Sequence, residues 1–375
     1  MTRMRVIHAP EAVAGNSPGL AHAETEIGLD SEAICLRPHP FGYEGVHVFG
    51  ERDPSALSAI FGMLSMFVYV LRNADVLHLN FGRSIFDPGP NVLSRIPRWS
   101  GLPFLFSCIQ RFEFFCYRLR RIPVVMTYQG DDVRQCDVSL EKYQFSMAQA
   151  VEQEYYPTGS DEKKRQRTRF YASRTKHTFF LNPDLHILLG DDSEFLAYTS
   201  VDPREWSYQE KQPDEIRHLV HAPSHRGTKG TEHLLEAVEM LQSEGIPFRF
   251  TLVEGMSREE AAQVYEQADL VVDQVLAGWY GGLAVECMAL GKPVIAYLRH
   301  SDFGALPDGM VKDLPFIEAN PDTIADVLRD WLQRPANDLT EKGRKGRAFV
   351  EKWHDPIKIA ERMRQVYESV LPKSK

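Results

Sequence analysis

Short apolar runs alternate with longer amphipathic stretches along most of the chain, which predicts strands separated by helices. The runs Met4–Ala9, Asp75–Phe81 and Pro123–Tyr128 are rich in apolar and β-branched residues, as is typical of buried parallel strands. The stretches Ala56–Leu71 and Phe104–Arg121 are long enough to be helices. Strands that alternate with helices in this way form doubly wound parallel sheets.

The alternation stops and then restarts near the middle of the chain. We expect a strand at Leu185–Leu189, followed by a polar, proline-containing linker between Phe195 and Glu215. New strands are expected at Ile216–His221, Phe248–Val253 and Asp269–Leu276. The prediction is an α/β protein with two doubly wound Rossmann-like domains that face each other across a ligand-binding cleft. Their expected extents are 1–198 and 199–354, with a C-terminal helix at 355–375 that crosses back to the first domain.

The stretch Ala268–Arg299 is the most informative part of the second half. It is predicted to form a strand, a glycine-containing loop, a helix that ends at Gly291 and Pro293, and a further strand. Open α/β sheets bind ligands at the carboxyl ends of their strands, where this loop lies. Glu286 falls in the middle of the apolar helix, so a protein cation, a backbone donor or a ligand has to compensate its charge.

Several groups around this helix suit a nucleotide diphosphate. Arg226 and Lys229 lie between a strand and a helix start, where two cations can meet phosphate oxygens. The first amides of the helix also stabilise phosphate, and the Glu286 carboxylate suits the two neighbouring hydroxyls of a ribose. The other candidates on this donor side are Gly281, Gly282, Leu283, Ala284, Tyr280, Asp273 and Glu254.

The first half offers candidates on the acceptor or sugar side. They are Gly15 and Asn16 in a glycine-containing turn, His78 and Asn80 at the end of a strand, and Gln129, Asp131 and Asp132 in the loop after the next strand. An ordinary turn, a hydrogen-bonded core histidine and helix capping by one aspartate are the structural alternatives. Two neighbouring aspartates do not make a metal site, so we expect no metal.

Two helices of the first half have a second interpretation. Phe104–Arg121 combines many aromatic residues with a basic end, which is compatible with core packing or with a surface for a lipid-linked partner or a membrane. Asp161–His177 is strongly basic, which is typical of a solvated face or of a site that attracts an anionic acceptor or an acidic membrane surface.

Composition narrows the class of protein. A net charge of −9 argues against nucleic-acid binding. Five cysteines without metal-ligand spacing suit a reducing cytoplasm, and the N-terminal residues run directly into a strand without a signal peptide. Ala56–Leu71 is too short for a membrane span and is predicted to be a core helix. We therefore expect a cytoplasmic protein that can associate peripherally with the inner face of the cell membrane, and we predict no oligomeric state.

The motifs Lys229-Gly230, Ala268-Asp269 and GGLAVECMALGKPVIAY resemble the retaining GT-B glycosyltransferases of group 1, family 4. This resemblance implies transfer of a sugar from a nucleotide-sugar donor to a sugar or lipid-linked hydroxyl acceptor, with retention and without a cofactor or metal. Glu286 matches the second glutamate of the family's E-x7-E motif, which binds the donor ribose. Arg226 and Lys229 match its basic pair at the diphosphate, and we assign them to catalysis together with Gln129.

The chain departs from the family at two positions that face the donor sugar. Gly278 stands where the first glutamate of the motif is expected, and Gln129 replaces the usual histidine. Asp273, Gln274, Trp279 and Tyr280 are candidates for the missing sugar contacts. A nucleotide-sugar epimerase or phosphorylase, or a non-catalytic nucleotide-sugar-binding protein, stays open. A dehydrogenase is disfavoured because no G-x-G-x-x-G follows the first strand.

Overall fold

The computed structural model describes residues 3–38, 45–51, 55–87, 101–208, 210 and 213–372. Positions 209, 211 and 212 of the expected linker lie outside the described residues. The chain divides into two compact units: unit 1 comprises 1–135, 156–200 and 356–375, and unit 2 comprises 136–155 and 201–355.

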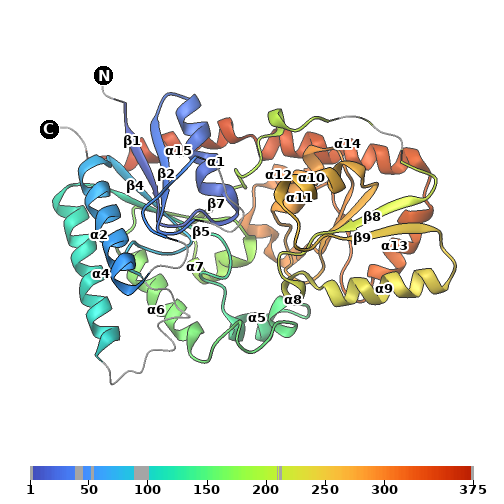
Figure 1. The fold of residues 1–375 in the computed structure, drawn as a ribbon, viewed down its shortest axis with the longest axis horizontal. Helices are drawn as coiled ribbons and strands as arrows, with labels where there is room; N and C mark the ends of the chain where they lie inside the picture. The colour runs from blue at the N-terminus through green and yellow to red at the C-terminus, as the bar shows by residue number, and fades with distance from the viewer. Residues whose placement is uncertain are drawn as a thin grey trace. The chain divides into compact units, whose positions relative to one another are not determined.

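Unit 1 is built on a seven-stranded parallel sheet with the strand order β3-β2-β1-β4-β5-β6-β7 (Figure 1). Its strands are β1 Arg5–Ala9, β2 Asp30–Cys35, β3 Val46–Val48, β4 Val76–Asn80, β5 Val124–Tyr128, β6 His177–Phe180 and β7 Ser193–Phe195. Its main helices are α1 Asn16–Glu26, α2 Ala56–Asn73, α4 Leu102–Leu119, α6 Ser160–Ala172, α7 His186–Leu189 and α15 Pro356–Val370. The three central strands β1, β4 and β5 are almost fully buried, which explains their continuous apolar character.

The expected strand at Leu185–Leu189 is wrong. Its first residue ends a 3-10 helix, Pro183–Leu185, and the rest forms α7, which stops at Gly190. A short apolar run fits a strand or a helix equally well, and here Pro183 favours a helical turn because its ring fixes φ. The last strand of the sheet, β7, begins after this turn.

Unit 2 is built on a five-stranded parallel sheet with the order β12-β11-β10-β8-β9. Its strands are β8 Arg217–His221, β9 Phe248–Leu252, β10 Leu270–Gln274, β11 Val294–Ala296 and β12 Ile317–Glu318. Its helices are α5 Cys136–Lys142, α8 Arg226–Lys229, α9 Thr231–Ser243, α10 Arg258–Gln267, α11 Gly282–Ala289, α12 Asp308–Asp313, α13 Ile324–Gln333 and α14 Ala336–Trp353. The S-x-x-E spacing of Ser257 and Glu260 forms a capping box at the start of α10, since each of the two side chains accepts a backbone N–H of the other residue.

Residues 136–155 leave unit 1 and join unit 2, although the sequence analysis treats 1–198 as one continuous domain. Met147, in this segment, is buried in the unit 2 core with Leu219, Leu234 and Leu276. The segment 136–155 therefore contributes to the hydrophobic core of unit 2. None of the helices in the described part of the chain has the length and apolar character needed to span a membrane.

Candidate functional site

A buried carboxylate ties the end of β10 to the start of α11. Asp273 is fully buried and accepts a hydrogen bond from the Gly281 backbone N–H at 2.5 Å. It also pairs with Lys229 Nζ at 2.9 Å. A Cβ atom on Gly281 would lie only 2.9 Å from Lys229 Nζ, so the glycine makes room for the lysine. The structure thus brings together three of the predicted residues.

Lys229 retains hydrogen-bonding capacity in this cluster. Its side chain is 13% exposed, and its ammonium group has three donors, of which Asp273 takes one. The adjacent N–H groups of Gly282 and Leu283 are the first of α11, where a helix supplies no backbone acceptor of its own. The Ala284 N–H already donates to the Gly281 carbonyl at 3.1 Å. The cluster therefore offers an ammonium and two amides to an anion.

Arg226 lies on the same short helix α8 but is held by a different acid. Its Nε and Nη2 donate to the Glu254 carboxylate at 2.8 and 2.7 Å, and Glu232 lies 3.6 Å away. The Arg226 hydrogen bond lowers the pKa of Glu254. Because both side chains are well exposed, this pair contributes little to stability and can open for a ligand. Glu254 is therefore the partner of Arg226 in this structure.

The acid in the middle of α11 has a cation beside it that the sequence analysis missed. Arg258 Nη2, from the first turn of α10, lies 3.6 Å from Glu286 Oε1. The Glu286 side chain is 22% exposed, and burial raises its pKa, while Arg258 opposes this shift. A pair at this distance compensates the carboxylate only in part, so Glu286 can still accept hydrogen bonds from a ligand. The capping box at Ser257 predicts this helix start, but no local signal indicates the pairing.

Arg299 fills the space beside Gly278, the position at which the glycosyltransferases that the sequence resembles have a glutamate. A Cβ atom on Gly278 would lie 2.6 Å from the Arg299 guanidinium carbon, and Gly278 has a φ of +78°. The guanidinium group stacks on the Tyr143 ring at 3.5 Å from its centroid and donates to Asp302 at 3.0 Å and to the Phe145 carbonyl at 3.1 Å. A glutamate at position 278 would therefore clash with a cation that is held on several sides.

The segment 136–155 supplies two of those contacts, which sequence reasoning could not have found. Arg299 lies three positions after the last residue of β11, and β11 lies next to β10 in the parallel sheet, so the ends of the two strands meet. The Arg299 backbone N–H donates to the Gly278 carbonyl at 2.8 Å. Tyr280, a predicted donor contact, is instead fully buried, with its hydroxyl 2.8 Å from His354 Nε2.

In unit 1, the loop after β5 is held by its own aspartates. The Asp132 carboxylate accepts the backbone N–H groups of Gln129, at 3.1 Å, and Gly130, at 2.7 Å. Burial raises the pKa of Asp132 to about 6, although these hydrogen bonds oppose the shift. Asp131 accepts from Arg134 at 3.0 Å and from a tyrosine hydroxyl. The side-chain amide of Gln129 is buried and has no hydrogen-bond partner among the described residues.

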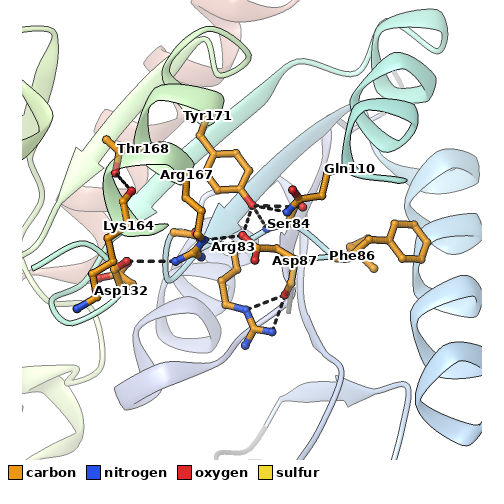
Figure 2. A network of polar contacts seen from close by, with 12 residues as sticks. Arg83, Ser84, Phe86, Asp87, Gln110, Asp132, Lys164, Arg167, Thr168 and Tyr171 are labelled. Atoms are coloured by element: carbon orange, nitrogen blue, oxygen red, sulfur yellow. Dashed lines mark hydrogen bonds and ion pairs between the residues drawn. The ribbon is translucent and has the colours of Figure 1, made fainter. Parts of the chain in front are cut away.

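A buried network on α6 supports this loop (Figure 2). Arg167 donates to the Asp87 carboxylate at 2.8 Å and to the Asp132 carbonyl at 3.3 Å, and Tyr171 donates to the same Asp87 carboxylate. Lys164 is also buried and donates to a backbone carbonyl at 2.5 Å. The basic run of the sequence is thus not a purely solvated face, because two of its cations hold the loops of unit 1 in place.

The turn at the start of α1 contains a second buried polar side chain whose hydrogen-bonding groups are not all used. Gly15 adopts a φ of +70° immediately before the helix. Asn16 is 6% exposed, and its Oδ1 accepts the Thr199 backbone N–H at 3.1 Å. Its Nδ2 has no partner among the described residues. Gly15 and Asn16 therefore form a built turn with one amide donor available.

His78 is a hydrogen-bonded core residue. The Tyr367 hydroxyl donates to Glu24 at 2.8 Å, so His78 Nδ1, at 2.8 Å, donates to that hydroxyl. His78 Nε2 then accepts from Thr127 at 2.7 Å. Burial lowers the pKa of His78, which keeps the ring neutral. Two protein groups thus satisfy the ring, as the structural alternative expects, and Asn80 beside it donates to the His78 carbonyl.

Comparisons with curated proteins find sequence similarity in one part of the chain, whereas no family model matches it. D-inositol 3-phosphate glycosyltransferases of two Mycobacterium strains, KMS and JLS, are 34% identical over 107 and 146 residues. These matches cover 26% and 32% of this chain, and the chain spans only 24% and 33% of the relatives' own lengths.

Solved structures match the whole chain at low identity. Sucrose-phosphate synthase from Thermosynechococcus elongatus has a TM-score of 0.62 at 14% identity, with 100% of both chains covered. The Anabaena protein HepE in complex with UDP-glucose has a TM-score of 0.60 at 10% identity, over 98% of this chain and 100% of HepE. A glycosyltransferase from Rickettsia africae has a TM-score of 0.59 at 12% identity, over 100% of both chains. At these identities the similarity shows the fold.

Proposed function

We propose that this chain, which has the GT-B fold and resembles the group 1 glycosyltransferases, transfers a sugar from a nucleotide-diphosphate donor to a hydroxyl acceptor. The observation that carries the proposal is the cluster of Lys229, Asp273 and Gly281 at the start of α11. It combines an ammonium group that has spare donors with the first amides of a helix. Both kinds of group suit phosphate oxygens.

The leaving diphosphate would be stabilised from two sides. Lys229 stays in place because Asp273 holds it, and its remaining donors can reach phosphate. Arg226 would exchange its exposed Glu254 partner for a phosphate and so add a second cation. Charge that develops on the diphosphate in the transition state would thus be met by Lys229 and the helix amides, which are already in place, and by Arg226 once it leaves Glu254.

The nucleoside end of the donor would extend toward Glu286. A carboxylate accepts hydrogen bonds from both hydroxyls of a ribose, and Arg258 would keep it charged next to the ligand. Glu286 follows Gly281 and Gly282 by about one helical turn, so one short segment can contact both the phosphates and the ribose. This arrangement supports nucleotide binding more directly than it supports any particular sugar.

We infer that the transfer proceeds with retention and without an enzymic nucleophile at position 278. Gly278 has no carboxylate, and the group beside it is the Arg299 cation. The acceptor hydroxyl would attack the anomeric carbon on the side from which the diphosphate leaves. The bond to the diphosphate breaks as the new glycosidic bond forms, and a departing phosphate oxygen takes the hydroxyl proton. These steps assign no role to a metal or a further cofactor.

The cellular setting is also part of the proposal. All five cysteines are free thiols, which supports a reducing compartment such as the cytoplasm. The aromatic and basic helices of unit 1 favour a lipid-linked or polysaccharide acceptor, and hence a role in surface polysaccharide or glycoconjugate synthesis. In the similar HepE structure the bound ligand is UDP-glucose, so UDP-sugars are the first donors to test.

The decisive experiment is a panel of UDP-, GDP-, ADP- and dTDP-sugars scored for nucleoside diphosphate release, with and without candidate acceptors and with EDTA. We expect one of the donors to release nucleoside diphosphate only when an acceptor is present, and we expect EDTA to leave the rate of this release unchanged. NMR of the product should show that the anomeric configuration of the donor sugar is retained. Donor conversion without an acceptor would favour an epimerase, and phosphate-dependent conversion would favour a phosphorylase. Tight donor binding with no release in any arm would indicate a non-catalytic binding protein and overturn the proposal.

A further inference from the structure

The exposed face of α2 carries large hydrophobic side chains from Leu57 to Val68. Large hydrophobic side chains recur at intervals of three and four residues, which places them on one side of the helix. Their exposed fractions are 73% for Leu57, 48% for Ile60, 71% for Phe61, 46% for Leu64 and 41% for Val68. The opposite side of α2, with Met66 and Val70, is fully buried against unit 1. The helix therefore has a core-facing apolar side and a second apolar side that faces solvent.

The helix α4 has the same property. Its exposed hydrophobic residues are Phe104 at 75%, Leu105 at 50%, Phe112 at 59%, Phe115 at 59% and Leu119 at 71%. Its buried side carries Glu113, Phe114 and Tyr117, which contact the interior of unit 1. Core packing therefore explains one side of this aromatic-rich helix and leaves the other unexplained.

These two helices lie side by side (Figure 1). The Phe67 and Tyr117 rings, one from each helix, have centroids 5.8 Å apart, and Arg120 Nε donates to the Leu71 carbonyl at 3.1 Å. Among the described residues, ten of the sixteen exposed large hydrophobic side chains belong to α2 and α4. The other six are distributed over different segments of the chain. We call these ten residues the apolar face. A soluble monomer seldom exposes so many large hydrophobics together without a binding partner.

A basic groove borders the apolar face at the end of α4. Its volume is about 640 Å³, and Phe115 of the apolar face forms part of its lining. Five cations line it: Arg111, Arg118, Arg121, Arg174 and Lys176. Among the described residues, no aspartate or glutamate lines this groove or forms an ion pair with any of the five. Arg174 stacks on the Phe170 ring, and its pKa is lowered by burial and by the charge of Arg111.

We propose that the apolar face and the basic groove together bind a membrane surface that contains anionic phospholipid. The hydrophobic side chains would enter the boundary between headgroups and acyl chains, with α2 and α4 lying along the surface. The arginines would reach the phosphate groups from the ends of their apolar stems. Charge complementarity selects this occupant, because the chain as a whole has a net charge of −9 and would otherwise be repelled by an anionic surface. The proposal does not depend on the reaction that the protein catalyses.

The test is co-sedimentation of the full chain with vesicles. One set contains phosphatidylcholine alone, and the other contains equal parts of phosphatidylcholine and phosphatidylglycerol. The apolar variant is Phe61→Ser with Phe112→Ser, and the charge variant is Arg111→Gln with Arg118→Gln. Matched controls replace exposed residues elsewhere, namely Ile187→Ser with Met240→Ser and Arg249→Gln with Arg344→Gln. Thermal unfolding of each variant confirms that it is folded.

We expect the protein to bind the anionic vesicles and not the neutral ones, and to dissociate as salt is raised. The charge variant should bind about fivefold more weakly for each arginine removed, and the apolar variant should lose most of its binding. Both controls should bind like the unmodified chain. Equal binding to neutral vesicles, or no binding to either kind, would overturn the proposal. So would concentration-dependent self-association that the apolar variant abolishes, because the face would then be an interface between copies of this chain.

Discussion

The loop that follows β5 in unit 1 and the loop that follows β10 in unit 2 are both held in place by a buried aspartate, but the two aspartates have different partners. Each lies at the carboxyl end of an internal parallel strand, and each is held by a buried aspartate that accepts backbone N–H groups. Asp132 in unit 1 forms its hydrogen bonds within its own loop. Asp273 in unit 2 adds a direct ion pair with Lys229. The first loop therefore offers a ligand a neutral amide, Gln129, and the second offers a cation.

This difference shows that an aspartate at the end of a strand does not by itself indicate a ligand-binding carboxylate. Asp132 and Asp273 were both predicted as site residues, but each carboxylate is buried and accepts hydrogen bonds from the backbone, so neither is freely available to a ligand. What each loop can bind depends on the partner of its aspartate. In the described part of the chain no cation pairs with the Asp132 carboxylate, and burial raises its pKa to about 6. The Asp273 carboxylate does pair with a cation, Lys229, and fixes it beside the first amides of α11.

Replacing Asp273 with alanine should have the largest effect, because it leaves Lys229 with little exposure and no counter-charge. We expect the free energy of unfolding, measured with urea, to fall by about 3–5 kcal/mol, and donor binding to be lost. Asp322→Ala, at an exposed position of the same unit, serves as the control. Adding Lys229→Met should recover part of the stability, and the absence of any recovery would show that the two charges are not coupled.

Gly278→Glu, which introduces the glutamate of the glycosyltransferases that this sequence resembles, should be the next most harmful change. The backbone of the new residue must adopt a positive φ and its side chain must displace Arg299, so we expect a loss of about 2–4 kcal/mol in unfolding free energy and a fall in turnover. Gly304→Glu is the matched control, since no atom lies within 4 Å of a Cβ atom there. Combining Gly278→Glu with Arg299→Ala should relieve the clash and leave the backbone strain. Higher activity in the single variant would contradict this account.

Glu286→Ala tests the nucleoside end of the unit 2 site. If the carboxylate binds ribose hydroxyls, donor affinity measured by calorimetry should weaken by about 1–3 kcal/mol while the unfolding midpoint stays close to that of the unmodified chain. Glu236→Ala, an exposed glutamate within α9, is the control. Unchanged donor affinity together with lower stability would instead mean that Glu286 serves only to pair with Arg258.

Asp132→Asn should have the smallest effect and a characteristic pH dependence. The folded pKa of Asp132, about 6, is raised above its ordinary value of 3.8, so its contribution to stability is present below about pH 4 and lost as pH rises through 6. Asparagine does not titrate. Between pH 4 and pH 6 the unfolding free energy of the variant should therefore rise by on the order of 1–2 kcal/mol relative to that of the unmodified chain. Urea unfolding at both pH values measures this. A difference that does not change with pH would show that Asp132 is ionised throughout.

The sequence by itself determined the architecture, because apolar runs of strand length and helical periodicity are local properties of the chain. The two doubly wound α/β domains were predicted in this way, and the resemblance at the βαβ unit around Glu286 added the assignment to the GT-B fold. The helix end at Gly291, with a φ of +76°, depends on neighbouring residues and was predicted correctly, and the capping box at Ser257 is likewise a local S-x-x-E pattern. The run Leu185–Leu189 was too short for periodicity to distinguish a helix from a strand.

Only the tertiary structure decided which polar residues hold the loops in place and which are available to bind a ligand. Arg299 reaches Gly278 because two parallel strands end side by side, and the segment 136–155 joins unit 2 to supply Tyr143 as its stacking partner. Lys229 meets Asp273 across 44 positions of sequence. Burial and pairing at such separations depend on the packing of the whole unit, and no local pattern encodes them.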